Sequence, residues 1–445
     1  MPFPLRNGIF FRVTGRLQDS YRCKGVCGME YRMELASAER IQQWIESMDQ
    51  YNATPGEGTT RVAFSEQDLC NRRYVTEQME KLGLEVQVDA IGNIFGTLPG
   101  ECRNLAPVWT GSHTDTIPNG GKFDGMAGVA AGLEAVRLIR DAGTKHRRDI
   151  CVVTYTAEEP AGYGLSCIGS RALAGALTEE DTERLKGADG ESLHEAMVRA
   201  GLPVERFRDL ARKKGEVYAA VELHVEQNVC LETEKKQIGI VTKICAPSNY
   251  LITVTGEQGH AGGRDMYTRK DAYMAACEMA LTLEVIARNC DSEWNTATVG
   301  HVEVYPDSVN VIPGVCRFSV DIRDCSMEYK CDTIQRIRYS FQKIAERRGV
   351  KFTMEEWNHD CPCTCDDSIT RYMRDYCKQL GYCSMNLISG PYHDSLFLAH
   401  FTKVAMLFVP SKCGISHSPE EWTAYEDIAR GANVLAGTLL YLANK

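Results

Sequence analysis

The sequence has no apolar run of the ~18 residues that a membrane-spanning helix requires. It also has no long basic run, since 50 lysines and arginines stand against 60 acidic residues for a net charge of -10. Nucleic acids and anionic membranes both require clustered positive charge, so we expect neither as a partner. No Gly-x-Gly-x-x-Gly segment opens a helix after a strand, which excludes a dinucleotide-binding oxidoreductase.

Cysteine, in contrast, is abundant, with 19 residues. An odd number spread along a long chain is not a disulfide framework. We therefore expect reduced thiols and a cytoplasmic location, with many cysteines acting as small core hydrophobes. Two cysteine clusters are disfavoured as metal sites. Cys23 and Cys27 lie in an unpromising N-terminal stretch, and the alternating Cys361, Cys363 and Cys365 have no fourth ligand at zinc-site spacing.

The first 28 residues differ from the rest of the chain. Their short apolar patch lacks the apolar core and the cleavage site of a signal peptide. Met29 and Met33 stand just before a helix-like segment, SAERIQQWIESMDQY. We expect residues 1–32 to form an N-terminal extension that is disordered, or whose first 28 residues lie upstream of the true start.

Strand-like and helix-like segments alternate through most of the remaining chain. Apolar runs at 107–113, 149–159 and 403–410 alternate with helical patterns such as 125–143, which favours an α/β sheet buried on both faces. Residues 247–357 differ, because three strand-like runs are separated by two long helical stretches. We predict an α/β mixed-sheet catalytic domain, residues 33–246 and 358–445, interrupted by an α+β domain of residues 247–357, with two helices on a small antiparallel sheet.

Residues of metal-ligand type follow several of the predicted strands. In open α/β sheets, binding sites form at the carboxyl ends of strands. Taken singly, each such residue has an ordinary explanation: a structural histidine, a surface glutamate or a helix N-cap aspartate. Their joint placement, with nitrogen and oxygen donors, indicates a Zn²⁺ or Mn²⁺ site rather than a thiolate site. The residues are His113, Asp124, Glu158, Glu159, His224 and His417.

Asp115 follows His113 by two residues. On a strand this spacing places both side chains on one face. We expect the Asp115 carboxylate to hold the His113 imidazole in the tautomer that binds a metal.

Seven motifs occur in order from about residue 35 to the C-terminus: GSHTDTIPNGGKFDG, TAEEPAGYGLSCIGSRALAG, ELHVEQ, GHAGG, NVIP with DIRD, GPYHDS and GISHSPEE. Together they resemble the hydantoinase/carbamoylase branch of the aminoacylase-type metallopeptidase superfamily. That branch includes N-carbamoyl-L-amino-acid hydrolase, β-ureidopropionase, allantoate amidohydrolase and ureidoglycolate amidohydrolase. The resemblance implies an amidohydrolase that cleaves the carbamoyl (ureido) C–N bond of a small ureido acid and releases ammonia and carbon dioxide.

The resemblance also implies two divalent metal ions per subunit, Zn²⁺ or Mn²⁺, which would polarise the ureido carbonyl. His113, Asp124 and His224 would bind one ion. Asp124 would bridge to the second ion, which Glu159 and His417 would complete.

By the same resemblance, Glu158 would be the general base and acid, taking a proton from the attacking water and passing it to the leaving nitrogen. Peptidases of the superfamily usually have a carboxylate where this chain has His224. The histidine therefore favours the ureido-cleaving branch over a metallo-dipeptidase or aminoacylase. A binding protein without catalysis is disfavoured because every expected ligand and Glu158 are present.

Three further residues with implied roles fall in residues 247–357. His260 and Asn310 would donate to the developing oxyanion, and Arg323 would clamp the substrate carboxylate. This region would then be a closing lid and the interface of a homodimer, and some of its groups could reach the partner's site. A salt bridge to a neighbouring aspartate is the structural alternative for Arg323. Other residues implied to bind substrate are Gln227, Gly390 and His393.

The substrate prediction rests on finer differences. Asn228 and Val229 follow ELHVEQ, where the branch usually has Gly-Pro. Three segments, EEPAGYGLSCIGSR, ICAPSNYLITVTG and GPYHDSLFLAH, look closer to the ureidoglycolate-cleaving members than to the allantoate-cleaving ones. We therefore expect a ureidoglycolate- or allantoate-type substrate, with N-carbamoyl-L-amino acids or N-carbamoyl-β-alanine as the alternative.

Overall fold

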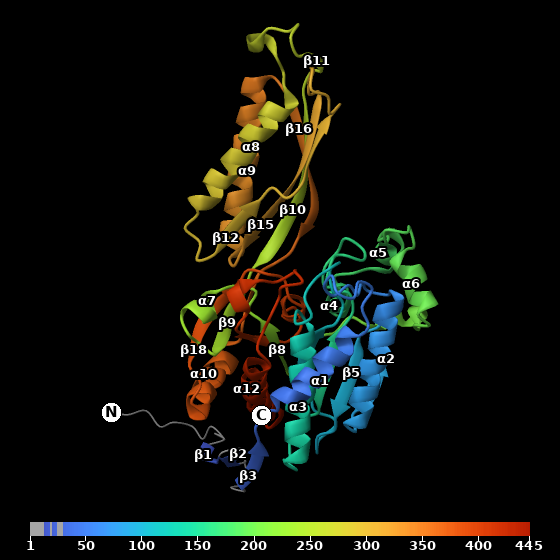
Figure 1. Ribbon diagram of the computed structural model, residues 1–445, viewed down its shortest axis with the longest axis vertical. Coiled ribbons are helices and arrows are strands. Elements are labelled where there is room, and N and C mark those ends of the chain that lie inside the picture. Colours follow the sequence, from blue (N-terminus) through green and yellow to red (C-terminus); the bar gives the residue numbers. More distant parts are fainter. Residues whose placement is uncertain (1–12, 18–19, 25–29) are drawn as a thin grey trace, which may run out of the picture. The chain divides into compact units, whose positions relative to one another are not determined.

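The computed structural model describes residues 13–17, 20–24 and 30–445. Their chain forms two compact units, each described here by itself (Figure 1). The first runs to Thr242 and includes residues 364–387 and 393–445; the second contains residues 243–363 and 388–392. The predicted insert spans 247–357, so the sequence did not indicate that the short segment 388–392 belongs with it.

The first unit is built on a mixed nine-stranded sheet in the order β17-β9-β19-β8-β6-β7-β5-β4, with β18 paired to β9. Its central strands β19, β8, β6 and β7 are parallel. Every residue of β6, β7 and β8 is buried, as expected for parallel strands covered on both faces. The strand bounds are β4 (Glu85–Val88), β5 (Ile94–Leu98), β6 (Val108–His113), β7 (Ile150–Tyr155), β8 (Ala219–Val225), β9 (Ile238–Ile244), β17 (Cys363–Thr364), β18 (Ser384–Ser389) and β19 (Lys403–Val409).

Helix α3 (Met126–Asp141) packs closely on this sheet and is buried along most of its length. A Cβ atom at Gly128 would lie 2.3 Å from the carbonyl oxygen of Leu223, so only glycine allows this approach. Helices α1 and α12 pack against α3. The helices of this unit are α1 (Ala38–Asp49), α2 (Glu66–Lys81), α3, α4 (Ile168–Leu173), α5 (Glu179–Arg184), α6 (Leu193–Arg199), α7 (Cys230–Thr233), α10 (Asp367–Leu380), α11 (Ser395–Leu398) and α12 (Tyr425–Ala443).

Helix α1 shows how sequence positions these elements. The Ser37 hydroxyl caps its N-terminus by accepting the backbone N–H of Arg40. Ile41, Ile45 and Met48 are buried at helical spacing and join the main core. Apolar burial of this kind stabilises a fold by about 25 cal/mol per Å².

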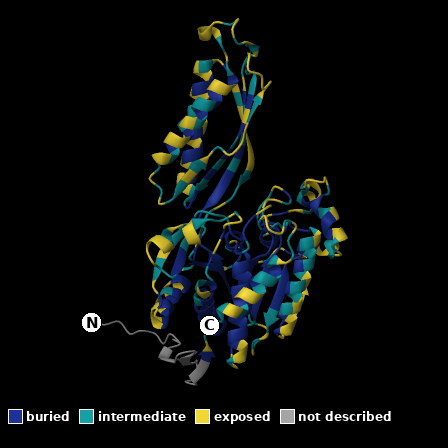
Figure 2. Cartoon of the chain, viewed as in Figure 1, coloured by how far each residue is buried: buried dark blue, intermediate teal, exposed yellow. Residues whose placement is uncertain are grey.

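The second unit is an antiparallel five-stranded sheet, β12-β15-β10-β16 with β13 paired to β15, covered by two helices. The ten residues of β15 alternate between buried and more exposed, the pattern of a sheet with one covered face (Figure 2). The predicted α+β architecture is confirmed. The elements are β10 (Ala246–Thr255), β11 (Gly259–His260), α8 (Ala272–Arg288), β12 (Asn295–Thr298), β13 (Val302–Tyr305), β14 (Val311–Ile312), β15 (Val315–Asp324), α9 (Met327–Arg348) and β16 (Lys351–His359).

The N-terminal extension contains the antiparallel strands β1 (Val13–Leu17), β2 (Ser20–Lys24) and β3 (Glu30–Glu34). The disorder predicted for residues 1–32 stays a prediction. Residues 1–12, 18–19 and 25–29 lie outside the described part of the chain. Among the residues that are described, no helix combines the length and apolar character needed to cross a membrane.

Candidate metal centre

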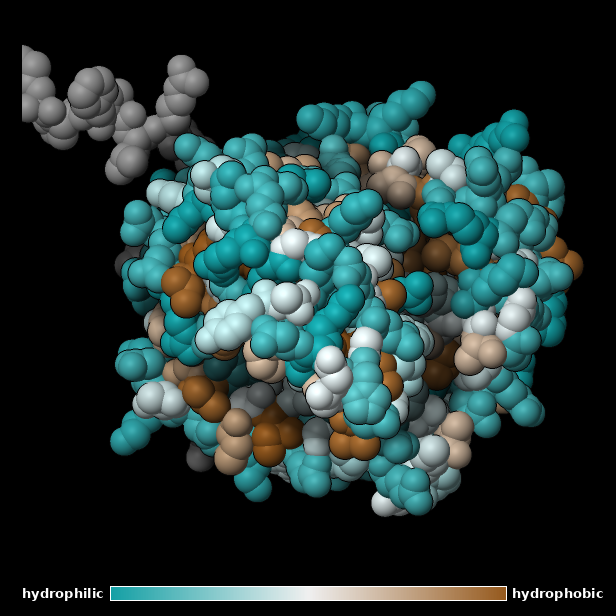
Figure 3. Space-filling model, turned by 90° about the horizontal axis from the view of Figure 1, so that it is seen from above, coloured by the Kyte–Doolittle hydropathy of each residue, from teal (hydrophilic) through white to brown (hydrophobic). Residues whose placement is uncertain are grey.

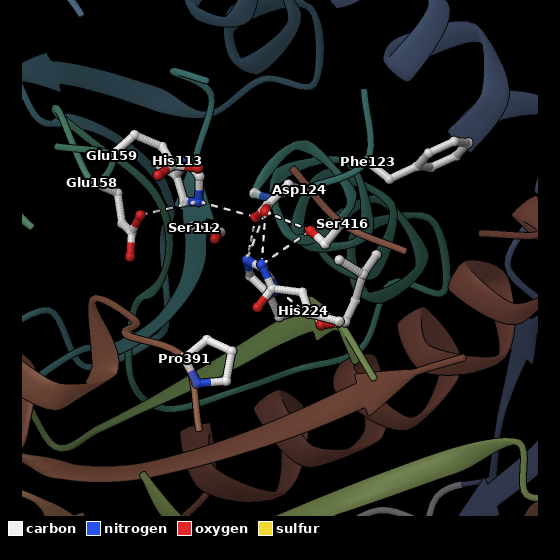
Figure 4. Close-up of polar contacts among 12 residues, drawn as sticks. Ser112, His113, Phe123, Asp124, Glu158, Glu159, His224, Pro391 and Ser416 are labelled. Carbon is white, nitrogen blue, oxygen red and sulfur yellow. Dashed lines mark hydrogen bonds and ion pairs between the residues drawn. The ribbon is translucent and has the colours of Figure 1, made fainter. Parts of the chain in front are cut away.

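The candidate residues converge at the carboxyl ends of the parallel strands of the first unit (Figure 4). His113 ends β6, and His224 lies near the end of β8. Glu158 and Glu159 follow β7 by a short turn, whereas Asp124 stands two residues before the first residue of α3. A parallel sheet brings such positions to one edge, as the sequence predicted.

Asp124 lies at the centre of this convergence. Two groups of three residues each bring one potential ligand atom per residue within 4.8 Å of the others. The first group is His113, Asp124 and His224, and the second is Asp124, Glu159 and His417. Asp124 Oδ1 is 3.1 Å from His224 Nε2 and 3.6 Å from His113 Nε2. Asp124 Oδ2 is 3.2 Å from His417 Nε2, which is also 3.2 Å from Glu159 Oε1. The structure thus brings all five predicted ligands together in two groups that share Asp124.

The donor set and its charge fit a pair of divalent cations. Three imidazole nitrogens and two carboxylates are ligands that suit Zn²⁺ or Mn²⁺. Burial opposes ionisation of Asp124, but the three histidines hold the pKa of this carboxyl well below its usual range. Hydrogen bonds to Asp124 and Glu159 raise the pKa of His417 to about 11. Positive charge is therefore favoured here, and the two ligand groups indicate a dinuclear metal site, as the resemblance implies.

Backbone carbonyls orient two of the imidazoles. Nδ1 of His113 lies 3.0 Å from the carbonyl oxygen of Asp115, and Nδ1 of His224 lies 3.0 Å from that of Val225. Both rings thereby present Nε2 toward Asp124, the tautomer needed for a metal ligand. The expected contact from the Asp115 carboxylate is not what holds His113, because its Oδ1 lies 3.8 Å from Nδ1.

The Asp115 carboxylate instead fixes the turn after β7. It accepts hydrogen bonds from the backbone N–H groups of Glu158 at 3.2 Å and Glu159 at 2.9 Å. Asp115 therefore positions the two glutamates through its carboxylate and the imidazole through its backbone carbonyl.

Glu158 is buried beside the predicted ligands. Its Oε2 lies 3.7 Å from His113 Nε2, and its Oε1 accepts a hydrogen bond from the Cys167 thiol at 3.4 Å. Burial raises its pKa well above the usual range; the His113 imidazole opposes this and Glu159 adds to it. A carboxyl group held near the protonated form is suited to both accepting and donating a proton.

The backbone is strained where it carries these side chains. Ala157, Gln227 and His417 are non-glycine residues with φ of 52°, 56° and 54°. Such conformations cost roughly 1–3 kcal/mol each and gather at functional sites. At Gly125, with φ of 68°, a Cβ atom would lie 2.5 Å from the His113 ring, so this position requires glycine.

Supporting residues that the sequence did not single out surround the ligands. Glu421 accepts the backbone N–H groups of Phe123 at 2.8 Å and Asp124 at 2.9 Å. The Ser416 hydroxyl lies 3.1 Å from Asp124 Oδ2 and 2.9 Å from Glu421 Oε2. Only their place in the sequence indicated a role at the site, because both stand within the motif GISHSPEE, which contains His417.

Glu222 is a third residue that the sequence analysis did not single out. It lies two positions before His224 on β8 and accepts hydrogen bonds from the hydroxyls of Ser112 at 2.9 Å and Ser395 at 2.6 Å. Ligand-type atoms of Glu222, His224 and His393 also lie within 4.8 Å of one another. The His393 ring is buried against that of His224, with 4.5 Å between centroids.

Gln227 contacts a predicted ligand directly. Its Nε2 donates to Asp124 Oδ2 at 2.7 Å and lies 3.3 Å from the Ser416 hydroxyl. Its Oε1 is buried without a hydrogen-bond partner among the described residues. The structure thus shows Gln227 in contact with Asp124, and its substrate-binding role stays a prediction.

The remaining predicted residues belong to the second unit. His260 on β11 pairs with Val311 on β14, and the backbone N–H of Ala261 donates to the carbonyl of Asn310 at 2.8 Å. The two side chains that were predicted to act together, His260 and Asn310, thus come from adjoining segments, and both are exposed. Their roles at the metal centre stay predictions.

Arg323 on β15 forms a salt bridge to a neighbouring aspartate, which the sequence analysis gave as the alternative to binding the substrate carboxylate. It binds Asp321 through two hydrogen bonds of 2.9 and 3.1 Å and donates to the carbonyl of Gly390 at 3.3 Å. Arg323 and Gly390, both predicted to bind substrate, are therefore in contact. The side chain remains 30% exposed, and its predicted role in binding the substrate carboxylate stays a prediction.

Comparisons with known proteins agree with this geometry. The sequence model of Peptidase family M20/M25/M40 matches residues 109–441. The chain is 37% identical to ureidoglycolate hydrolase from Arabidopsis thaliana, over 91% of this chain and 87% of that protein. It is 38% identical to an N-carbamoyl-L-amino acid amidohydrolase from Geobacillus stearothermophilus, over 92% and 99%.

Solved structures give the same result. The crystal structure of AtUAH in complex with (S)-hydroxyglycine is similar with a TM-score of 0.82 and 36% identity, over 92% of this chain and 98% of that one. An amidase of the hydantoinase/carbamoylase family from Burkholderia multivorans has a TM-score of 0.83 and 33% identity, over 92% and 99%.

Proposed function

This chain belongs to peptidase family M20/M25/M40, in its hydantoinase/carbamoylase branch, and on that premise we propose that it hydrolyses the ureido C–N bond of a ureidoglycolate-type acid. A metal-dependent amidohydrolase acting on C–N bonds is what the branch and the buried ligand groups support. The single observation that carries the reaction class is Asp124 shared between two ligand groups, with Glu158 next to His113.

The proposed roles follow from the geometry. His113, Asp124 and His224 would hold one ion, and Asp124, Glu159 and His417 would hold the other. When bound, two Zn²⁺ or Mn²⁺ ions supply Lewis-acid polarisation of the ureido carbonyl and activation of water.

Glu158 takes the proton of the attacking water and delivers it to the leaving nitrogen, the task for which its burial and raised pKa suit it. Arg323 binds the substrate carboxylate, and His260 with Asn310 donates to the oxyanion. Gln227, Gly390 and His393 complete the substrate pocket.

The choice of substrate rests on the relatives. Two of them are named ureidoglycolate hydrolase, and AtUAH was crystallised with (S)-hydroxyglycine and with glyoxylate. Relatives of comparable identity are named N-carbamoyl-L-amino acid amidohydrolases, so N-carbamoyl-L-amino acids are the second candidate.

The assembly expected from the sequence is a homodimer formed through the second unit. Apolar side chains are exposed on α8 at Met274, Leu281 and Val285, and on β13 at Val302. On the face seen in Figure 3, hydrophobic residues are interspersed with hydrophilic ones. Light scattering on purified protein checks the dimer, and cell fractionation checks the cytoplasmic location.

The experiment that tests the function is ammonia release from a substrate panel. Protein reconstituted separately with Mn²⁺ and Zn²⁺ is given ureidoglycolate, allantoate, N-carbamoyl-L-amino acids, N-carbamoyl-β-alanine and an N-acetyl amino acid. We expect ureidoglycolate to be turned over fastest and Glu158→Gln to lower the rate by roughly 10²–10⁴-fold. Glu77→Gln, at an exposed position on α2, is the matched control and should keep full activity. Cleavage of the N-acetyl compound alone would replace the proposal with an aminoacylase.

A further inference from the structure

The first unit contains a cavity of about 280 Å³ that shares no lining residue with the metal centre. Its floor is formed by Phe95, Thr97, Trp109 and Cys151. Thr97 pairs with Cys151, and Cys151 with Trp109, so these side chains form one row across β5, β7 and β6. Trp109 stands four residues before His113 on β6, so the cavity lies toward the opposite end of the strand from the predicted ligands.

The floor is aromatic and apolar. The rings of Phe95 and Trp109 lie 5.3 Å apart at 59°, and both side chains are at most 8% exposed. The Thr97 hydroxyl donates to the Cys151 thiol at 3.6 Å, so this polar group is already engaged. The floor therefore offers a ligand the apolar faces of two rings tilted against each other.

One guanidinium at the cavity has a donor without a hydrogen-bond partner among the described residues. Arg212, which follows the 3₁₀ helix η1 (Val204–Asp209), lines the cavity, and its Nε is buried with no hydrogen-bond partner among the described residues. An unsatisfied buried donor costs about 1–3 kcal/mol. A ligand that accepts from this guanidinium would remove that cost.

The carboxylates that line the cavity, Asp89, Asp149 and Asp209, do not serve this purpose, because they have other partners. Asp89 accepts from the backbone N–H groups of Ile91 at 3.1 Å and Asn93 at 2.8 Å. Asp149 accepts from the backbone N–H of Gly100 at 2.8 Å and lies 3.1 Å from Arg103 Nε. Asp209 lies 3.6 Å from Arg206 Nε. The planar donor fork of Arg212 is thus available to an outside anion, and a carboxylate matches its geometry.

We propose that this cavity is an accessory, non-catalytic binding site for a small organic carboxylate with a flat apolar body. The carboxylate binds Arg212, and the body packs on Phe95 and Trp109. The cavity volume of about 280 Å³ falls just below the range for ligand pockets, about 300–1,000 Å³, which limits the ligand to roughly one ring.

Benzoate is the probe that tests the site, with the full-length protein. Trp109 is one of five tryptophans, and we expect saturable quenching of its fluorescence as benzoate is added. Arg212→Gln should weaken binding about 10- to 100-fold, the loss of a charge-assisted hydrogen-bonded pair. Arg208→Gln is the matched control, because Arg208 is exposed, binds Glu179 and does not line the cavity. It should leave binding unchanged.

Additional variants and ligands distinguish this cavity from the metal centre and from nonspecific binding. Arg323→Gln should not affect benzoate binding, and Trp109→Phe should remove the fluorescence signal while calorimetry still detects binding. Benzamide, which lacks the charge, and inorganic phosphate, which lacks the ring, should each bind at least tenfold more weakly to the unaltered protein.

If Arg212→Gln does not fold, Arg212→Lys keeps the positive charge without the planar donor fork and should show an intermediate loss of benzoate affinity. The proposal is wrong if about 10 mM benzoate gives no saturable change, if benzamide or phosphate binds as well as benzoate, or if Arg323→Gln abolishes binding.

Discussion

Glu421 accepts the backbone N–H of Asp124 at 2.9 Å, linking the loop after β19 to the turn that carries the shared ligand. The same carboxylate accepts the N–H of Phe123, and Ser416 bridges it to the Asp124 side chain. Both N–H groups are buried, so Glu421 is what satisfies them. Asp124 can therefore hold its position between three imidazoles only while Glu421 is in place.

Replacing Glu421 should weaken metal binding without touching a ligand. We expect Glu421→Ala to lower metal affinity about 10- to 100-fold, as loss of a residue that orients a ligand does. Two buried N–H groups would also lose their acceptor, at about 1–3 kcal/mol each. Metal content after dialysis and thermal unfolding of the metal-free protein measure the two effects. Glu420→Ala, at the exposed neighbouring position, is the control, and an equal effect in both variants would contradict this role.

Gln227 allows two roles to be separated. Its Nε2 donates to Asp124 Oδ2 at 2.7 Å, although the sequence predicted a contact with substrate. If the contact with Asp124 dominates, Gln227→Ala lowers metal affinity by about 10-fold or more and leaves KM little changed once metal is saturating. If substrate binding dominates, KM rises while metal content is retained. Kinetics at saturating metal, combined with metal titration, distinguish the two results.

Asp89 should make stability depend on pH. It is buried, and burial raises its pKa to about 6, although Asn93 and Ile91 donate hydrogen bonds to it. A carboxyl whose pKa is raised on folding adds stability below its unfolded pKa, and this stability is lost as pH rises through about 6. Asp89→Asn does not ionise, so it should gain about 3 kcal/mol relative to the unaltered protein between pH 4 and 7.

Denaturant unfolding at several pH values measures that difference. Asp375→Asn, at an exposed position on α10, is the control, and its free energy of unfolding relative to the unaltered protein should not change with pH. If the difference in free energy of unfolding for Asp89→Asn also does not change with pH, Asp89 has its ordinary pKa in the folded protein.

The sequence predicted the parts of the structure that follow from chain-local patterns. Apolar runs ending in His113, Glu158 or His224 specify strands, and parallel strands must bring their carboxyl ends together. The sequence did not predict the contacts that depend on whether a residue reaches its neighbour through its backbone or its side chain. Asp115 has the expected spacing from His113, yet its carbonyl contacts the ring while its carboxylate holds the next turn.

Long-range partners were missed for a related reason. The importance of Glu421 depends on the path of the loop after β19, which no periodicity encodes. Residues 388–392 join the second unit through contacts such as Arg323 with Gly390, which only the folded chain reveals. Glu134 is the first charged residue of a helix whose first two turns are apolar, and its burial is explained only by its arginine partners.

Glu134 is a buried carboxylate that connects α1 to α3. It accepts hydrogen bonds from the backbone N–H of Ser37 at 2.9 Å and from Arg40 Nη2 at 2.9 Å, and lies 3.0 Å from Arg137 Nε. Burial alone would raise its pKa, but Arg137 and Arg40 outweigh it and lower the pKa. The stability it contributes is therefore present at neutral pH and lost in acid.

Removing this charge should be costly, because Arg137 is only 8% exposed and would be left with Asp141 as its remaining acidic partner. We expect Glu134→Gln to lower the free energy of unfolding by about 3–5 kcal/mol, as breaking a buried ion pair does. Glu77→Gln is the matched control: its 3.9 Å pair with Lys81 is exposed, so the loss should be at most about 0.5 kcal/mol. Denaturant unfolding of both variants at pH 7 compares the two. A loss at Glu134 no larger than that at Glu77 would show that α1 is held to α3 by its apolar face, Ile41, Ile45 and Met48, without help from the buried charge.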